Sequence, residues 1–268
     1  MMNRVDILLT YWGDFGLLKQ SVESVVQQTE TNWRLVIIDD CYPSNEAQKY
    51  FAKNADPRIT YIRHAKNIGI TKNFNYAIDL ATADYCMLLG CDDILEPNYL
   101  EQALAKIDNA DFYQPGVTVI DGDGNPCAPI PDRIKRLLRP RAGLHSGQSL
   151  AASLSSGNWL YFPSILWRTK TIQRYRFDEK YTIVEDVKLQ LSIIRDGGTV
   201  YVDNKKTFRY RRFAQSLSSI EKKSGGVRFD EEADVYNYFS NEFSAIGWRR
   251  AAIAARFRVT SRLHKLLS

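Results

Sequence analysis

The chain has 268 residues, of which 44% are hydrophobic, 25% charged and 12% aromatic. This ordinary globular composition excludes disordered, collagen-like and low-complexity proteins, and the length is enough for a sizeable core. The 36 Lys and Arg residues against 31 Asp and Glu give a formal net charge of +5, a mild basic excess.

The sequence contains no sign of a membrane span, a secretion signal or a disulfide scaffold. No stretch approaches the ~20 uninterrupted apolar residues that a spanning helix needs. Residues 1–4 lead directly into an apolar run, without a signal-peptide pattern. The four cysteines include no Cys-x-x-Cys pair. We therefore expect a cytosolic protein with reduced thiols.

Strand and helix patterns alternate along the first 110 residues, which predicts a mostly parallel sheet with right-handed crossovers. Short apolar runs predict the strands, and apolar residues at helical spacing predict the helices between them. In chain order the predicted elements are a strand at 5–10, a helix at 17–26, strands at 35–38 and 59–62, a helix at 73–81, a strand at 85–89 and a helix at 97–107.

The pattern changes after residue 110. Residues 121–147 are rich in Gly, Pro and Arg, which predicts a long irregular loop. Gly225-Gly226 is the expected break before C-terminal helices. Between these two segments the sequence predicts a helix at 149–155, a strand at 160–167, a helix at 184–195 and a strand at 199–202.

The C-terminal segment is basic and amphipathic. From Gly247 to Ser268 there are six basic residues and no acidic one. Two interpretations stay open: the helix attaches to anionic lipid headgroups, or it packs its apolar stripe on the domain. At the helical period this stripe contains Trp248, Ala252, Ala255, Val259, Leu263 and Leu266.

Two carboxylate pairs, Asp39-Asp40 and Asp92-Asp93, each follow a buried apolar run directly. Ligands bind at the carboxyl ends of strands in open parallel sheets, so both pairs are expected at that edge. A divalent metal that carries a phosphorylated ligand would offset their repulsion. The alternative is that these aspartates only terminate strands and cap helices.

The order of several short sequences carries a family resemblance. They are Thr10-Tyr11, residues 21–28, residues 37–40, Asn67-Ile68-Gly69 with Asn75, and residues 88–93 with Pro97. In this order they resemble the N-terminal half of a family 2 glycosyltransferase with the GT-A fold, closely over residues 4–108 and loosely through Glu185-Asp186 and Tyr210–Arg212.

The resemblance implies a Rossmann-like α/β fold, with a mostly parallel central sheet flanked by helices and a C-terminal helical extension. Residues 1–110 would bind a nucleotide sugar, and 111–213 would bind the acceptor within the same domain. Residues 214–268 would form a helical, basic, amphipathic tail.

The resemblance also implies a set of donor contacts. Thr10 and Tyr11 would contact the base and ribose, because an aromatic ring stacks on a nucleobase. Asp39 would accept a hydrogen bond from the base, and Gly69 would allow a close backbone approach. The implied donor-binding residues are Thr10, Tyr11, Asp39, Asn67, Gly69, Lys72 and Asp92.

The metal motif of the family is incomplete in this chain. Asp92 corresponds to its last carboxylate, but Gly90 stands at its first position and Phe213 stands where the family often has a histidine. We expect Asp92, with Asp93, to hold Mn²⁺ or Mg²⁺ weakly in the absence of nucleotide. Arg211 and Arg212 would neutralise the leaving diphosphate, since guanidinium binds phosphate bidentately.

Glu185-Asp186 opens a predicted helix beside the expected acceptor cleft. The family places its catalytic base at the aspartate of such a pair, here Asp186, with Glu185 orienting it or contacting the acceptor. A base of this kind takes the proton of the acceptor hydroxyl as it attacks the anomeric carbon. The alternative is an acidic pair that favours a helix N-terminus.

The sequence therefore predicts an inverting glycosyltransferase of bacterial cell-envelope type, cytoplasmic or peripheral on the inner face of the membrane. A UDP- or dTDP-type sugar would be the donor, and a glycan or lipid-linked saccharide the acceptor. The alternatives are a sugar nucleotidyltransferase, which lacks support from a Gly-rich loop, and a non-catalytic nucleotide-sugar-binding module. RNA binding by the basic tail has no supporting motif, so no nucleic-acid partner is expected.

Overall fold

The computed structural model describes residues 5–54, 56–212 and 227–257. Within them, nine strands form one central sheet. The first half of this sheet has the strand order β3-β2-β1-β4, and each pair of adjacent strands within these four is parallel. This half confirms the predicted strands, whose bounds are β1 (Val5–Tyr11), β2 (Trp33–Asp39), β3 (Ile59–Arg63) and β4 (Tyr85–Gly90).

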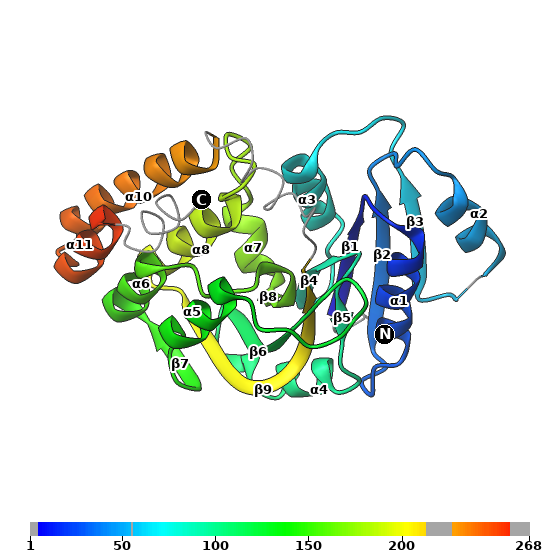
Figure 1. The fold of residues 1–268 in the computed structure, drawn as a ribbon, viewed down its shortest axis with the longest axis horizontal. Helices are drawn as coiled ribbons and strands as arrows, with labels where there is room; N and C mark the ends of the chain where they lie inside the picture. The colour runs from blue at the N-terminus through cyan, green and yellow to red at the C-terminus, as the bar shows by residue number, and fades with distance from the viewer. Residues whose placement is uncertain (1–4, 55, 213–226, 258–268) are drawn as a thin grey trace.

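Helices cover both faces of the parallel half, which explains its continuous apolar runs (Figure 1). Ile7 and Leu9 pack on the face that carries α1 (Phe15–Val26), α2 (Glu46–Lys53) and α4 (Tyr99–Leu104). Leu8 points the other way and packs with Phe74 of α3 (Ile70–Asp79). The alternation follows from the two-residue period of a strand.

The second half of the sheet is mixed, so the prediction of a mostly parallel sheet applies to the first half alone. Strand β8 is antiparallel to β4 and to β6, whereas β6 and β9 are parallel. Strands β5 and β7 are antiparallel to β9. The bounds are β5 (Ile94–Leu95), β6 (Phe112–Ile120), β7 (Gly143–Ser146), β8 (Leu166–Arg168) and β9 (Thr199–Arg211).

Two predictions for the second half are wrong. Residues 121–147 contain a helix, α5 (Ile130–Leu138), and strand β7 in place of one irregular loop. Pro131 did not prevent this helix, because a proline in the first turn removes no helical hydrogen bond. The strand predicted at 160–167 is a 3₁₀ turn at Phe162–Ser164 followed by the short β8, since Pro163 cannot donate to a ladder.

The remaining helices are α6 (Gly147–Ser156), α7 (Thr169–Tyr175), α8 (Glu185–Arg195), α10 (Val227–Ala245) and α11 (Arg249–Phe257). Of these, α10 and α11 lie at the end of the molecule opposite α2, and α7 lies near the middle (Figure 1). None of the helices in the described part of the chain is long and apolar enough to cross a membrane.

The described part of the C-terminal stripe packs on the domain. Helix α11 lies against α6 and α10, and it buries Ala252 and Ala255 there. Trp248 stacks on Phe243. Val259, Leu263 and Leu266 of the predicted stripe lie outside the described residues, as do Phe213 and Gly225-Gly226.

Candidate functional site

The carboxyl ends of β1, β2 and β4 lie side by side. Tyr11 is the register partner of Asp39, and Thr10 is the register partner of Gly90. This confirms that the two carboxylate pairs, which follow β2 and β4, share one edge of the sheet. The structure then shows which of the predicted side chains are free at that edge and which are used to build it.

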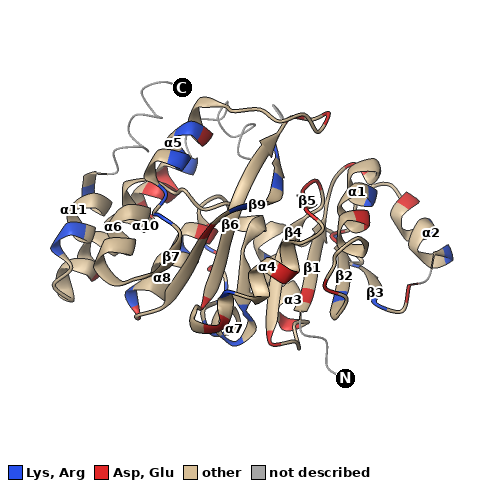
Figure 2. Ribbon diagram, turned by 90° about the horizontal axis from the view of Figure 1, so that it is seen from below, with Lys and Arg blue, Asp and Glu red and all other residues tan. Residues whose placement is uncertain are grey.

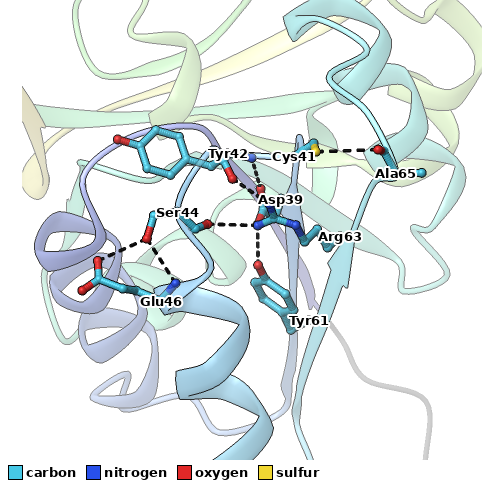
Figure 3. A network of polar contacts seen from close by, with 8 residues as sticks. All are labelled: Asp39, Cys41, Tyr42, Ser44, Glu46, Tyr61, Arg63 and Ala65. Atoms are coloured by element: carbon cyan, nitrogen blue, oxygen red, sulfur yellow. Dashed lines mark hydrogen bonds and ion pairs between the residues drawn. The ribbon is translucent and has the colours of Figure 1, made fainter.

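Asp39 is the centre of a buried polar network (Figure 3). Its side chain is fully buried, and Oδ1 accepts from the Tyr42 amide at 2.7 Å. Oδ2 accepts from the Tyr61 hydroxyl and from Nη1 of Arg63, the latter at 2.5 Å. Arg63 also donates to the carbonyls of Tyr42 and Ser44. Asp39 thus fixes the loop after β2, and burial with this carboxylate raises the pKa of Tyr61.

Asp40 shapes the neighbouring loop. Its two carboxylate oxygens accept from the amides of Ile68 and Gly69 at 2.8 and 3.0 Å. The Gly69 amide is also 3.0 Å from Oδ1 of Asn67. Gly69 has a φ of 86°, a conformation that favours glycine. Asn67 is exposed, and Lys72 is exposed on the first turn of α3.

The aromatic residues at the end of β1 differ in their access to a ligand. Tyr11 is only 1% exposed, and its ring packs in the core beside Tyr42. Among the described residues its hydroxyl has no hydrogen-bond partner, and burial together with Asp39 raises its pKa. Trp12 is 49% exposed and meets Tyr42 edge to face. The ring surfaces open to a nucleobase are therefore those of Trp12 and the half-buried Tyr42, which the sequence analysis did not assign.

The two residues of the second carboxylate pair, Asp92 and Asp93, differ in their exposure to solvent. Asp92 is half-buried, whereas Asp93 is 1% exposed and accepts from the Arg211 amide at 2.9 Å. Burial and the adjacent Asp92 carboxylate raise the pKa of Asp93 well above its usual range. Burial also raises the pKa of Asp92, against the Arg211 charge. Of the two, Asp92 is the carboxylate that a ligand can reach.

Arg211 is a structural clamp at this edge. The side chain is 4% exposed, and Nε donates to the Asp92 carbonyl at 2.9 Å. Its other nitrogens donate to the carbonyls of Asp121 and Gly122 and to the Gln20 side chain. The guanidinium therefore ties together three segments that are far apart in the sequence, and little of its donor capacity remains for a diphosphate.

Arg212 is the more accessible arginine. Its Nε and Nη2 donate to the two oxygens of Asp132 at 2.6 and 2.8 Å, and its side chain is 27% exposed. Tyr161 also donates to Asp132, at 2.8 Å. Asp132 lies on α5, so the pair joins this helix to the end of β9.

Lys135, also on α5, interacts electrostatically with both Arg212 and the predicted base, Asp186. Its Nζ donates to the Leu160 carbonyl at 2.6 Å and lies 4.5 Å from the centre of the Tyr161 ring. Burial and the Arg212 charge lower the pKa of Lys135 to about 8, although Asp186 opposes them.

Asp186 lies in the first turn of α8, as the sequence predicted. Its Oδ2 accepts a long hydrogen bond of 3.4 Å from Asn158, and Oδ1 accepts from the Val187 amide at 2.7 Å. Burial raises the pKa of Asp186, and the positive charge of Lys135 opposes this shift. Glu185 is 7% exposed and faces inward.

A continuous set of neighbours connects the three carboxylates. Tyr11 interacts electrostatically with both Asp39 and Cys91, the residue before Asp92. Arg211 holds the Asp92 carbonyl, and the next residue, Arg212, binds Asp132. On the same helix as Asp132, Lys135 interacts with Asp186. These contacts link the ends of β1, β2 and β4 through β9 to helix α5, and α5 to the start of α8.

The metal-ligating groups in this region are sparse. Within the described residues, no group of three or more His, Cys, Asp or Glu side chains could hold a metal ion. A Cβ placed on Gly90 would lie 2.7 Å from Oδ2 of Asp93 and 3.1 Å from Oδ1 of Asp92. A side chain at residue 90 would therefore adjoin both carboxylates, and the Asp93 carboxylate would have to shift to admit it.

The sequence matches the family model described as Glycosyl transferase family 2 over residues 7–169. It is similar to the Escherichia coli K12 protein WcaA, named for glycosyl transfer in colanic acid biosynthesis, at 36% identity over 102 residues. That match covers 38% of this chain and only 37% of WcaA. EpsE of Bacillus subtilis, named as a glycosyltransferase, is 24% identical over 81% of this chain and 79% of its own length.

The fold is also similar to a solved structure, residues 1–349 of S. aureus TarS in complex with UDP-GlcNAc. The TM-score is 0.68, with 90% of this chain and 66% of the TarS chain covered. The sequence identity is 16%, so this likeness shows a common GT-A fold.

Proposed function

The chain belongs to glycosyl transferase family 2, and from this premise we propose that it is an inverting enzyme of cell-envelope biosynthesis. It would move a sugar from a UDP- or dTDP-type donor to a hydroxyl of a glycan or lipid-linked saccharide. The name of WcaA, in colanic acid biosynthesis, supports this class of product. The observation that supports the proposal is the shared edge of β1, β2 and β4, which carries Asp39 and Asp92, together with the contacts that lead from it through Arg211, Arg212 and Lys135 towards Asp186.

In this proposal residues 1–110 hold the donor. Thr10 and Tyr11, at the end of β1, lie beside the end of β2. Because the Asp39 carboxylate is fully buried, it would serve the base by holding Tyr42 and the loop after β2 in place, rather than by accepting the direct hydrogen bond that the sequence predicted. Trp12 and Tyr42 would supply the ring surface that the buried Tyr11 ring does not offer. The donor contacts predicted for Asn67, Gly69 and Lys72 involve the loop that Asp40 fixes and the start of α3.

Asp92 and Arg212 would share the charge of the diphosphate. Asp92 would hold Mn²⁺ or Mg²⁺ together with phosphate oxygens, and Asp93 would support it from within the protein. A bound ion would neutralise charge on the leaving nucleoside diphosphate. Because one reachable carboxylate is a poor site alone, the residues present fit an ion held mainly in the presence of nucleotide.

Residues 111–213 would bind the acceptor, with Asp186 as base. Its carboxylate would take the proton of the acceptor hydroxyl while that oxygen bonds to the anomeric carbon. The bond from this carbon to the diphosphate oxygen would break on the opposite side, which inverts the anomeric configuration. The raised pKa of Asp186 makes it a better proton acceptor than an exposed aspartate.

A thermal-shift panel of nucleoside diphosphates and nucleotide sugars, with and without Mn²⁺, tests the donor site. A donor present at 100 times its Kd should stabilise the fold by about 2.7 kcal/mol, which corresponds to a rise of roughly 5–11 °C in Tm. The best donor is then offered with lipid-linked acceptors in a transfer assay. A panel in which no nucleotide raises Tm would contradict the donor site.

Restoring the missing carboxylate should tighten the metal site. We expect Gly90→Asp to bind Mn²⁺ at least about ten-fold more tightly without nucleotide, because a second reachable carboxylate would join Asp92, with the Asp93 side chain shifting to make room for it. Without metal the same variant should be less stable, since three carboxylates repel one another. Calorimetric titration with Mn²⁺ measures the gain, and Gly90→Asn provides a control of equal size. Equal Mn²⁺ affinity in both variants would show that a carboxylate at residue 90 does not complete a metal site with Asp92.

Lys135 should set the pH range of the reaction. Its positive charge opposes the rise in the pKa of Asp186, so Lys135→Met should move the acid limb of the kcat/KM profile to higher pH. The native enzyme should also lose activity as the pH rises through about 8, because Lys135 then loses its proton and its positive charge. Lys135→Met has no charge to lose, so its activity should not fall in this pH range. We expect the variant to be at least about ten-fold slower at its optimum. Lys135→Arg keeps the positive charge and should keep most of the activity. A kcat/KM profile of Lys135→Met with the same pH dependence as the native profile would exclude the proposed role of the Lys135 charge.

A further inference from the structure

Helix α5 has two faces of opposite character. At about 100° per residue, Ile130, Ile134 and Leu137 lie within roughly 60° of one another. Asp132 and Lys135 lie on the other side of the helix, where they contact Arg212 and the Leu160 carbonyl. The apolar stripe therefore points away from the candidate site.

The stripe is exposed to an unusual degree for large aliphatic side chains. Ile130 is 72% exposed, Ile134 41% and Leu137 83%. The exposed Arg133 lies roughly 60° from Ile130 around the helix and the exposed Arg136 roughly 120° from it. Arg141 is exposed beyond the end of the helix, and Figure 2 shows the basic segments on α5. The helix has one acidic residue, Asp132, and its carboxylate is paired with Arg212 on the inner side. The outer face thus combines apolar and cationic groups.

We propose that the outer face of α5 docks on an anionic lipid bilayer. Aliphatic side chains flanked by arginines match the boundary between acyl chains and negatively charged headgroups, where such helices lie in the plane of the interface. A protein partner fits less well, because a nine-residue helix is only about 13 Å long and stable interfaces bury ~800 Å² per partner. The surface is distinct from the C-terminal stripe, whose described residues Ala252 and Ala255 are buried.

The position of α5 gives this docking a consequence for the reaction, which rests on the proposed function. Inner-face residues of the same helix contact Arg212 and lie near Asp186. The bilayer would therefore lie about one helix diameter, ~10 Å, from the site. An acceptor sugar linked to a lipid would be presented to Asp186 close to the headgroups, without leaving the membrane.

Co-sedimentation of the full chain with vesicles tests the proposal without any sugar or nucleotide. Native protein should bind vesicles of equal parts phosphatidylcholine and phosphatidylglycerol, and should bind pure phosphatidylcholine much less, with high salt weakening the contact. The double variant Ile134→Glu/Leu137→Glu should bind the anionic vesicles at least about ten-fold more weakly. Because both side chains are exposed, its Tm should stay near the native value.

Two control proteins locate the contact. Val26→Glu changes an exposed apolar residue on α1 and should bind like the native chain. Ile253→Glu/Phe257→Glu changes the exposed apolar residues of α11. Native-like vesicle binding by the α5 variant, loss confined to the α11 variant, or dimerisation through α5 without vesicle binding would each overturn the proposal. If one of these outcomes were found and the native protein still transferred a sugar to a soluble acceptor, the docking of α5 would be wrong but the proposed function would stand.

Discussion

Replacing Asp186 by asparagine should lower the rate of glycosyl transfer by about 10²- to 10⁴-fold, the usual contribution of a general base. Asparagine keeps the shape of the side chain and its position in the first turn of α8, but its amide cannot take the proton of the acceptor hydroxyl. The donor lies against the loop after β2 and Asp92 in our account, so the rise in Tm on donor binding should be unchanged. Steady-state kinetics with the identified donor and acceptor, together with the thermal shift, measure both effects.

Asp196→Asn is a matched control for this variant. Asp196 ends the same helix and pairs with Arg195 near the surface, away from the candidate site. We expect native activity from it. If Asp186→Asn also transferred sugar at the native rate, the base would lie elsewhere. If the native protein bound a donor but transferred its sugar to no lipid-linked acceptor, the chain would be a nucleotide-sugar-binding module.

Replacing Arg211 by methionine should destabilise the fold by about 3 kcal/mol, because a buried guanidinium that donates to four oxygens, two of them on the half-buried Asp92 and Asp121, would be lost. For a chain of this size the corresponding fall in Tm is roughly 6–12 °C. The Asp92 backbone would lose its anchor as well, so donor-induced stabilisation should fall with it. Thermal or urea unfolding measures the first effect, and the nucleotide titration measures the second.

Arg209→Met tests whether any arginine of β9 would give the same result. Arg209 lies on the same strand and forms an ion pair with Glu96, but its side chain is 44% exposed. An exposed pair of this kind contributes at most about 1 kcal/mol. Equal destabilisation by the two variants would show that Arg211 is not a special clamp at the edge of the site.

The parallel half of the sheet could be predicted from the sequence because its signals are local. Each strand is an apolar run, and Asp39-Asp40 and Asp92-Asp93 mark where two of the runs end. Parallel pairing then brings these ends to one edge without further information. The start of α8 at Glu185-Asp186 was equally visible, because an acidic pair precedes a periodic apolar pattern.

What could not be predicted depends on contacts between distant residues. In sequence, Arg211 and Arg212 look equivalent, and only the fold shows that one is buried among carbonyls while the other pairs with Asp132. Lys135 lay in a segment interpreted as a loop, since α5 exposes its apolar side chains and its composition is rich in Arg and Pro. The burial of the Tyr11 ring was hidden for the same reason, because it depends on Tyr42 packing over it.

A crystal structure with a nucleoside diphosphate and Mn²⁺ tests the central claim most directly. We predict electron density for a diphosphate whose oxygens share a Mn²⁺ ion with Asp92 and lie beside Arg212, with the base near Thr10 and the loop after β2. The structure also has a cavity of about 290 Å³ lined by Tyr175, Arg176 and Lys188. A nucleotide bound there, or anywhere away from the carboxyl ends of β1, β2 and β4, would contradict the account.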